Sequence, residues 1–134
     1  MIETYQELLK TAKTIAVVGC SRDPSKDAHR VPVYLQAHGY RIIPVNPSAG
    51  AILGERCYPS LNELHEKVDI VDVFRPSNDV PTIVEQAVLM NQKPRAIWTQ
   101  LGIVSEEGRK RAEANGIVFV EDKCIMTEHR RLHA

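Results

Sequence analysis

Several features that would define a class of function are scarce or missing in this sequence of 134 residues. Lysine and arginine together number 17, as do aspartate and glutamate, so the chain lacks the positive excess typical of nucleic-acid-binding proteins. No apolar run approaches the roughly 20 residues of a membrane-spanning helix. The stretch 1–13 is amphipathic and charged, unlike a signal peptide. We therefore expect a soluble, cytoplasmic protein without nucleic-acid or membrane partners.

Motifs of covalent and metal chemistry are also missing. The three cysteines, at positions 20, 57 and 124, form no CxxC pair, and their odd number suits reduced thiols better than a disulfide framework. The five histidines show no HxH, HExxH or Cys/His zinc spacing, and no serine lies in a GxSxG motif. We expect no metal site and no catalytic residues. Cys20 and Cys124 are interpreted as partly buried thiols rather than nucleophiles.

What is present is the composition and pattern of a folded α/β domain. Hydrophobic residues make up 43% and charged residues 25%, which is ordinary globular usage, and the length suits one domain over 1–134. Five apolar segments alternate with helical patterns, as in a parallel sheet with helices on both faces. The predicted strands are 14–18, 41–45, 69–74, 95–99 and 117–120, and the predicted helices are 1–13, about 28–38, 61–67, about 80–91 and 106–114.

This pattern predicts a Rossmann-like three-layer sandwich around a five-stranded, mainly parallel sheet. Periodicity does not reveal strand order; we expect the order 3-2-1-4-5, with the flavodoxin-like order as the alternative. Two helix starts carry capping signals. Ser60 with Glu63 resembles a capping box, and Ser105 precedes two glutamates suited to the positive end of a helix. The segment 121–134 shows no clear periodicity, and the sequence does not decide whether it forms a short final helix.

The stretch 14–30 contains the strongest signal for a ligand. The first strand ends at Gly19, a residue that permits a sharp turn and a close backbone approach, and Arg22, Lys26 and Arg30 follow. A helix begins near Ala28, and its N-terminus offers free N–H groups to a phosphate. The turn is thus a candidate anion site. The alternative is that any α/β protein needs a glycine turn here and solvates its loop with charges.

Other polar or unusual residues also follow predicted strands, where ligands of open α/β sheets bind. They are Gly19-Cys20-Ser21-Arg22, Asn46-Pro47, Phe74-Arg75-Pro76, Gln100-Leu101-Gly102 and Glu121-Asp122-Lys123-Cys124. A nicotinamide dinucleotide fits the pattern less well. The GxGxxG motif would need glycines where Ser21 and Pro24 stand, and Asn46 replaces the acidic residue expected to hold a ribose.

Taken together, these segments resemble the small stand-alone CoA-binding proteins, whose domain is similar to the CoA-binding domain of the succinyl-CoA synthetase α subunit. The resemblance runs in order from about Thr14 to His129. It is carried by AVVGCSRDPSKDAHRV, YLQAHGYRIIPVNP, ILGERCYPSL, VDIVDVFRPSNDV, AIWTQLGI and GIVFVEDKC.

The resemblance implies a Rossmann-like domain that binds coenzyme A across the carboxyl ends of its strands. The residues that match the family's binding positions are Gly19, Cys20, Ser21, Arg22, Lys26, Arg30, Asn46, Pro47, Phe74, Arg75, Pro76, Gln100 and Gly102. This chain has Lys26-Asp27-Ala28 where many relatives show Arg-Pro-Ser. The difference removes a hydroxyl and a planar guanidinium from the phosphate-binding turn.

Three functions therefore stay open. The first is a CoA-binding or regulatory module without catalysis, for CoA or an acyl-CoA, with a partner protein as one option. The second is an enzyme, either CoA-dependent or NAD(P)-dependent. The third is a thiol-redox protein that forms a mixed disulfide with CoA through Cys20 or Cys124.

Overall fold

The structure, a computed structural model, describes residues 3–48 and 50–133. Its elements in chain order are α1 (Tyr5–Thr11), β1 (Thr14–Val18), α2 (Asp27–Ala37), β2 (Arg41–Val45), β3 (Ala51–Ile52), β4 (Glu55–Arg56), the 3-10 helix η1 (Leu61–Glu63), β5 (Ile70–Val73), the 3-10 helix η2 (Ser77–Asp79), α3 (Val80–Val88), β6 (Ala96–Thr99), α4 (Glu106–Ala114), β7 (Val118–Val120) and α5 (Ile125–Leu132). All five predicted strands are present.

The five strands form one sheet in the order β2-β1-β5-β6-β7, and every neighbouring pair is parallel. In the numbering of the predicted strands this is 2-1-3-4-5, the flavodoxin-like alternative, so the expected order 3-2-1-4-5 is wrong. The third strand pairs with β1 instead, and at the carboxyl end of β2 the outer edge bonds to Tyr58. There the Tyr58 amide donates to Pro44 O at 3.0 Å, and the Asn46 amide donates to Tyr58 O at 2.8 Å.

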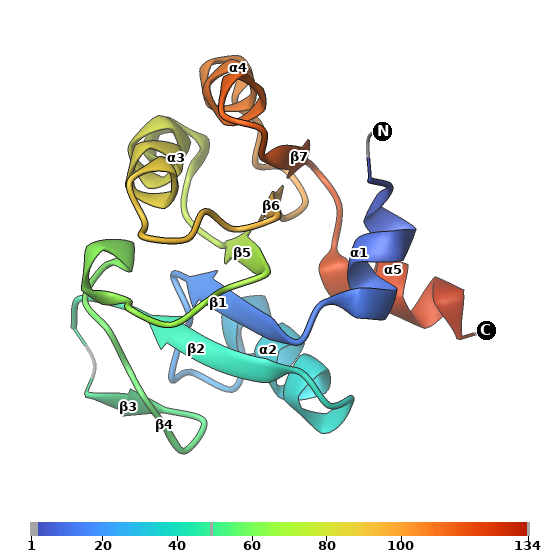
Figure 1. Cartoon of the computed structure of the whole chain (residues 1–134). Helices are drawn as coiled ribbons and strands as arrows, with labels where there is room; N and C mark the ends of the chain where they lie inside the picture. Colours follow the sequence, from blue (N-terminus) through green and yellow to red (C-terminus); the bar gives the residue numbers. More distant parts are fainter. Residues whose placement is uncertain (1–2, 49, 134) are drawn as a thin grey trace.

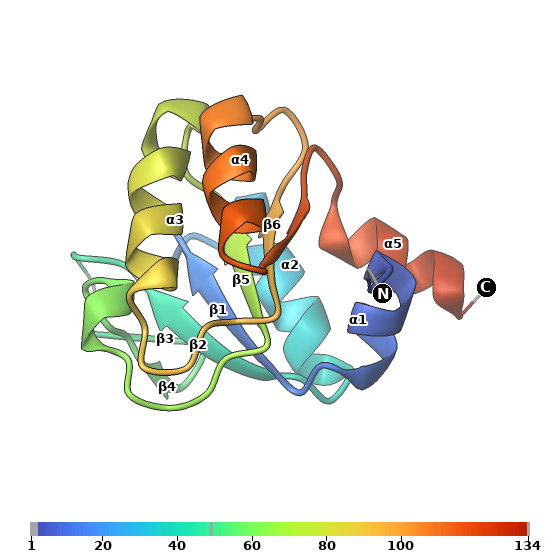
Figure 2. The same ribbon diagram turned by 45° about the horizontal axis from the view of Figure 1, so that its top comes forward.

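Helices cover both faces of the sheet, so the three-layer prediction is confirmed. Figures 1 and 2 show α3 and α4 on one face and α1, α2 and α5 on the other. The first face buries Val71 and Val73 of β5, and the second buries Val17 of β1 and Trp98 of β6. Strands enclosed on both faces need apolar side chains in both directions, which explains their nearly continuous apolar runs.

The capping signals had different outcomes. Ser105 is the N-cap of α4, and its hydroxyl accepts from the Gly108 amide at 2.9 Å, as predicted. The helix predicted over 61–67 is only the single turn η1, and within the described residues Ser60 makes no side-chain cap bond. Burial explains the early end: Leu64 is extended, with φ −84° and ψ 132°, and packs into the core beside Leu61.

The N-terminal helix is shorter than predicted, since α1 begins only after its N-cap Thr4; Met1 and Ile2 lie outside the described residues. At the other end of the chain, the segment that sequence left open forms α5. This helix packs against α1 and α2. Its His129 is only 5% exposed and hydrogen-bonds through Nδ1 with the Tyr34 hydroxyl at 2.7 Å. Among the described residues, no helix is long and apolar enough to cross a membrane.

Candidate functional site

The strand order creates a switch point between β1 and β5. The chain leaves β1 toward α2 on one face of the sheet, and it leaves β5 toward α3 on the opposite face. Ligands of open α/β sheets bind in the crevice that such a divergence leaves at the carboxyl ends of the strands. A cavity of about 630 Å³ lies there, lined by the turns after β1, β2 and β5 and by one face of α3.

Gly19 allows the turns after β1 and β5 to approach closely. Its φ is +90°, a region that side-chain-bearing residues rarely adopt, and its amide donates to Val45 O at 2.9 Å. A Cβ at this position would lie 3.2 Å from the Phe74 carbonyl and 3.1 Å from Arg75 Cδ. The missing side chain therefore makes room for the segment that follows β5.

The turn after β1 leads directly into the N-terminus of α2. The Ser21 amide donates to Ala28 O at 3.0 Å, which folds the turn back against the helix. The N-cap residue of α2 is Lys26. Its side chain carries no hydrogen-bond acceptor, and no described side chain caps the helix. The first amide groups of α2 therefore stay open to an anion, and Lys26 itself lines the same cavity.

Within this turn, the residues between Ser21 and Lys26 are held by local bonds. The Ser21 hydroxyl accepts from the Asp23 amide at 3.0 Å, and the Asp23 carboxylate accepts from both the amide and the hydroxyl of Ser25. These hydrogen bonds from Ser25 lower the pKa of Asp23. The turn is thus preformed, and within the described residues the Ser21 hydroxyl accepts a hydrogen bond but donates none.

Asn46 braces the end of β2 against the turn after β1. Its side-chain amide donates to Cys20 O at 2.9 Å, while its Oδ1 accepts from the Ser48 amide at 2.8 Å. Both ends of the side chain are thus used inside the protein. This explains why an amide stands where a nicotinamide-binding domain would carry a ribose-binding acid.

Beyond β5, the cavity is closed by Phe74, Arg75 and helix α3. Asp79, Thr82, Ile83 and Gln86 line the cavity and recur at spacings of three and four residues, so they share one face of α3. Periodicity predicts only that this helix packs on the sheet, so its contribution to the cavity was not predicted. The signal was the polar pair Thr82 and Gln86 beside apolar residues that face the core.

The structure brings many of the predicted site residues together. Those that line the cavity are Gly19, Cys20, Ser21, Lys26, Asn46, Pro47, Phe74 and Arg75. Lining residues that were not predicted as site residues include Ser48, Pro59 and Ser60, besides those on α3. Among the described residues, the predicted ones outside the lining are Arg22, Arg30, Pro76, Gln100 and Gly102.

The bonds of the outlying residues explain their positions. Arg30 forms an ion pair with Asp27 and donates through Nη1 to Ser25 O at 2.9 Å, so its guanidinium ties the loop to α2. Gln100 accepts from the Ile125 amide at 3.2 Å, and the Gly102 amide donates to Asp122 at 2.7 Å. Gln100 and Gly102 therefore brace the chain that enters α5.

Two titratable side chains near the turn after β1 are buried. Cys20 is fully buried, and burial, with a smaller contribution from the Cys57 thiol, raises its pKa to about 12. Asp72, in the middle of β5, is also fully buried, and neither carboxylate oxygen has a hydrogen-bond partner among the described residues. Burial raises the pKa of Asp72 well above its ordinary value. The described residues hold no group of acidic, histidine or cysteine side chains that could bind a metal ion.

Comparison with known proteins places the chain in a family. Residues 13–130 match the family model described as CoA binding domain, and the chain belongs to this family of CoA-binding domains. It is 37% identical over 124 residues to the uncharacterized protein YneT of Bacillus subtilis, covering 92% of this chain and 90% of YneT.

Larger and solved relatives extend the comparison. Acetate–CoA ligase [ADP-forming] II of Archaeoglobus fulgidus is 35% identical over 103 residues, which cover 75% of this chain but only 15% of the ligase. The chain is thus similar to one part of a much longer enzyme. The solved structure of the Thermus thermophilus protein cell-free ID.343 has 43% identity and a TM-score of 0.90, with 96% of both chains covered.

Proposed function

We propose that this chain binds coenzyme A or an acyl-CoA in the cavity at the carboxyl ends of β1, β2 and β5, as a binding module without catalysis of its own. The observation that carries the proposal is the open N-terminus of α2 with Lys26 at the switch-point cavity, in a chain that belongs to a CoA-binding family. The cavity volume of about 630 Å³ falls within the range of roughly 300–1,000 Å³ typical of small-molecule sites.

The chemistry of the lining suits the parts of this ligand. The pyrophosphate and the 3′-phosphate of CoA need cations and N–H donors, which Lys26 and the α2 amides supply. The adenine needs apolar or aromatic surface, for which Phe74 and Pro47 stand at the same cavity. The pantetheine arm carries amides that can bond with side chains such as those of Thr82 and Gln86 on α3.

The other functions weighed from sequence have less support. A mixed disulfide through Cys20 requires a thiolate, and the buried thiol with a pKa of about 12 disfavours one. The ribose of a nicotinamide cofactor would meet the Asn46 amide instead of an acidic side chain, and that amide already bonds to Cys20 O and to the Ser48 amide. For CoA-dependent catalysis, the lining holds no nucleophile paired with a base among the described residues.

Calorimetric titration with CoA, NAD⁺ and NADP⁺, in parallel and in reducing buffer, tests the proposal. We expect saturable binding of CoA and no heat with the nicotinamide cofactors. A companion incubation with acetyl-CoA, followed by chromatography, should return the thioester intact. Absence of CoA binding would contradict the ligand, and turnover of the thioester would contradict a module without catalysis.

A further inference from the structure

Arg75 and Asp79 form an ion pair in the wall of the proposed ligand cavity. Both residues line it, and one carboxylate oxygen, Asp79 Oδ2, accepts from Arg75 Nη2 at 2.9 Å and from Nε at 3.1 Å. The stem of Arg75 passes over Gly19, where a Cβ would lie 3.1 Å from Arg75 Cδ. The guanidinium is thus held at the glycine turn by an acidic side chain that faces the same cavity.

This pairing is a poor arrangement for binding an anion. Among the described residues Lys26 makes no ion pair, so it is the lining cation left with its full charge, while the charge of Arg75 is offset by Asp79. A phosphate that binds Arg75 must share or displace the carboxylate that already occupies its Nε and Nη2 donors, which offsets much of the gain from binding. Asp79 therefore lowers the affinity of this part of the cavity for an anion.

Stability of α3 does not account for the position of the Asp79 side chain. Asp79 is the N-cap residue of α3, yet within the described chain its carboxylate makes no cap bond and bonds to Arg75 instead. The pair is also roughly half exposed, with side-chain exposures of 53% and 45%. Exposed pairs of this kind add little to stability. What distinguishes the Arg75–Asp79 pair from an ordinary exposed ion pair is its position in the cavity wall.

We propose that Asp79 sets the anion affinity of the cavity by holding Arg75 in a neutral pair, which an anionic ligand must share or displace. Asp79 is thus a positioning residue that acts through Arg75. This inference rests on the proposed CoA site and adds a specific constraint: the bound ligand brings a phosphate to Arg75, and a neutral ligand gains nothing from removal of the carboxylate.

The test compares CoA affinities of the wild type and Asp79→Asn by calorimetry. Asparagine is as good an N-cap residue as aspartate, and its amide oxygen can still accept from Arg75. We expect roughly three- to tenfold tighter CoA binding, the scale of releasing one guanidinium from a partly exposed ion pair. Asp79→Ser, which is also neutral and a good N-cap residue, provides a second variant with the same expected direction.

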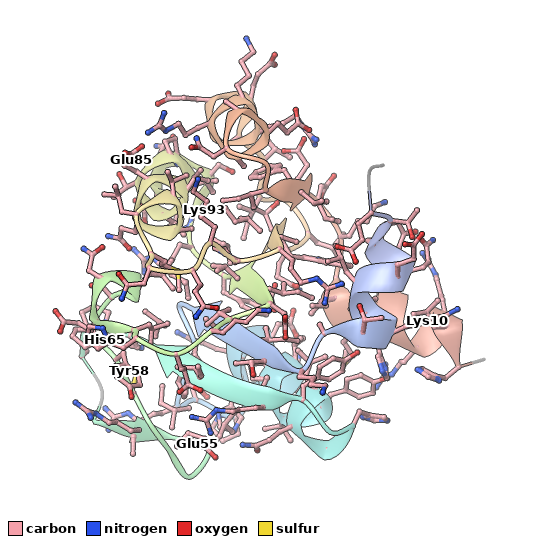
Figure 3. All side chains as sticks on the ribbon, in the orientation of Figure 1. Lys10, Glu55, Tyr58, His65, Glu85 and Lys93 are labelled. Carbon is pink, nitrogen blue, oxygen red and sulfur yellow. The ribbon has the colours of Figure 1, made fainter. Side chains whose placement is uncertain are left out.

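A matched control is available on the same helix. Glu85, labelled on α3 in Figure 3, accepts from Arg111 Nε at 2.9 Å and from Nη2 at 3.1 Å, with exposures similar to those of the Arg75–Asp79 pair. Glu85 does not line the cavity, so Glu85→Gln changes the net charge equally without touching the site. It should leave the CoA affinity unchanged.

A double-mutant cycle with Arg75→Gln separates action through Arg75 from direct repulsion. If Asp79 acts through Arg75, the gain from Asp79→Asn shrinks to less than twofold in the Arg75→Gln background. An undiminished gain there, or an unchanged or weaker affinity of Asp79→Asn and Asp79→Ser, would overturn the inference while leaving CoA binding intact. If the wild type itself fails to bind CoA, the proposed function falls, and this inference falls with it.

Discussion

At the residue scale, the cations near the phosphate-type turn differ in what already satisfies them. The Arg30 guanidinium bonds to Asp27 and to the Ser25 carbonyl, whereas Lys26 stands at the open end of α2 and lines the cavity. From sequence alone Arg22, Lys26 and Arg30 are equivalent because all three lie in the same short polar stretch after the first strand. In the structure, Arg30 differs from Lys26 because its charge is already paired with Asp27.

We therefore expect Lys26→Ala to weaken CoA binding by about 1–3 kcal/mol, the scale of a hydrogen bond between charged groups. Arg30→Ala, which removes a cation from the start of α2, serves as the control and should weaken binding less. Calorimetric titration of both variants provides the measurement. Equal losses would mean that the two cations act only through their general charge.

Asp72 leads to a prediction about stability. Because burial raises its pKa in the folded protein, the folded state retains the proton while the unfolded state releases it above its ordinary value of about 3.9. The contribution of Asp72 to the free energy of unfolding is therefore fully present below a pH of about 3.9, and it is lost as the pH rises toward the raised pKa.

Asp72→Asn removes this titration with little change of shape. We expect the wild type to lose up to about 1.4 kcal/mol of unfolding free energy per pH unit relative to the variant as pH rises. Urea unfolding of both proteins from pH 5 to pH 8 measures the difference. Parallel curves would show that Asp72 does not carry a shifted titration.

At the element scale, we expect the packing of α5 to depend on the protonation state of His129. Its imidazole packs against the rings of Tyr34, Tyr40, His38 and His133. Burial, and the neighbouring imidazoles of His133 and His38, lower the pKa of His129. The neutral form is thus favoured in the folded protein. The contribution of His129 to the free energy of unfolding is therefore fully present above the ordinary pKa of about 6.5, and it is lost as the pH falls below that value.

We expect the packing of α5 to weaken between pH 7.5 and pH 5.5. His129→Gln cannot titrate and should flatten the decline in unfolding free energy over this range. His65→Gln provides the control because His65 is exposed and lies away from α5, beside the labelled Tyr58 (Figure 3). An equal decline in the wild type and in His129→Gln would contradict the assignment to His129.

At the scale of the whole molecule, the net charge is zero, so an anionic ligand must be attracted by local groups rather than by an overall positive field. Binding to the folded state alone stabilises a protein by mass action. At a CoA concentration 100 times the dissociation constant, the expected gain in unfolding free energy is about 2.7 kcal/mol.

Thermal unfolding with and without CoA measures this gain. The unfolding midpoint should rise with CoA concentration, and NAD⁺ at the same concentration should leave it unchanged. The Lys26→Ala protein should need more CoA for an equal rise. An equal rise with both ligands would point to a general nucleotide effect rather than a CoA site.

Sequence by itself determined the features that depend on neighbouring residues. The apolar stretches 14–18 and 41–45 form strands at the predicted positions, and Ser105 caps α4, because strand formation and capping are set by a few adjacent side chains. The alternation of such segments was enough to predict the fold class. The ordered motifs were enough to indicate the family.

Tertiary structure alone decided the features that depend on residues far apart in the chain. The order β2-β1-β5 follows from Tyr58 occupying the edge of β2, which no local pattern reveals. Likewise, it is packing that brings a face of α3 to the cavity beside Gly19 and buries Asp72 without a partner. Local periodicity indicates which side of a helix or strand is apolar, but only the packed chain determines what each side meets.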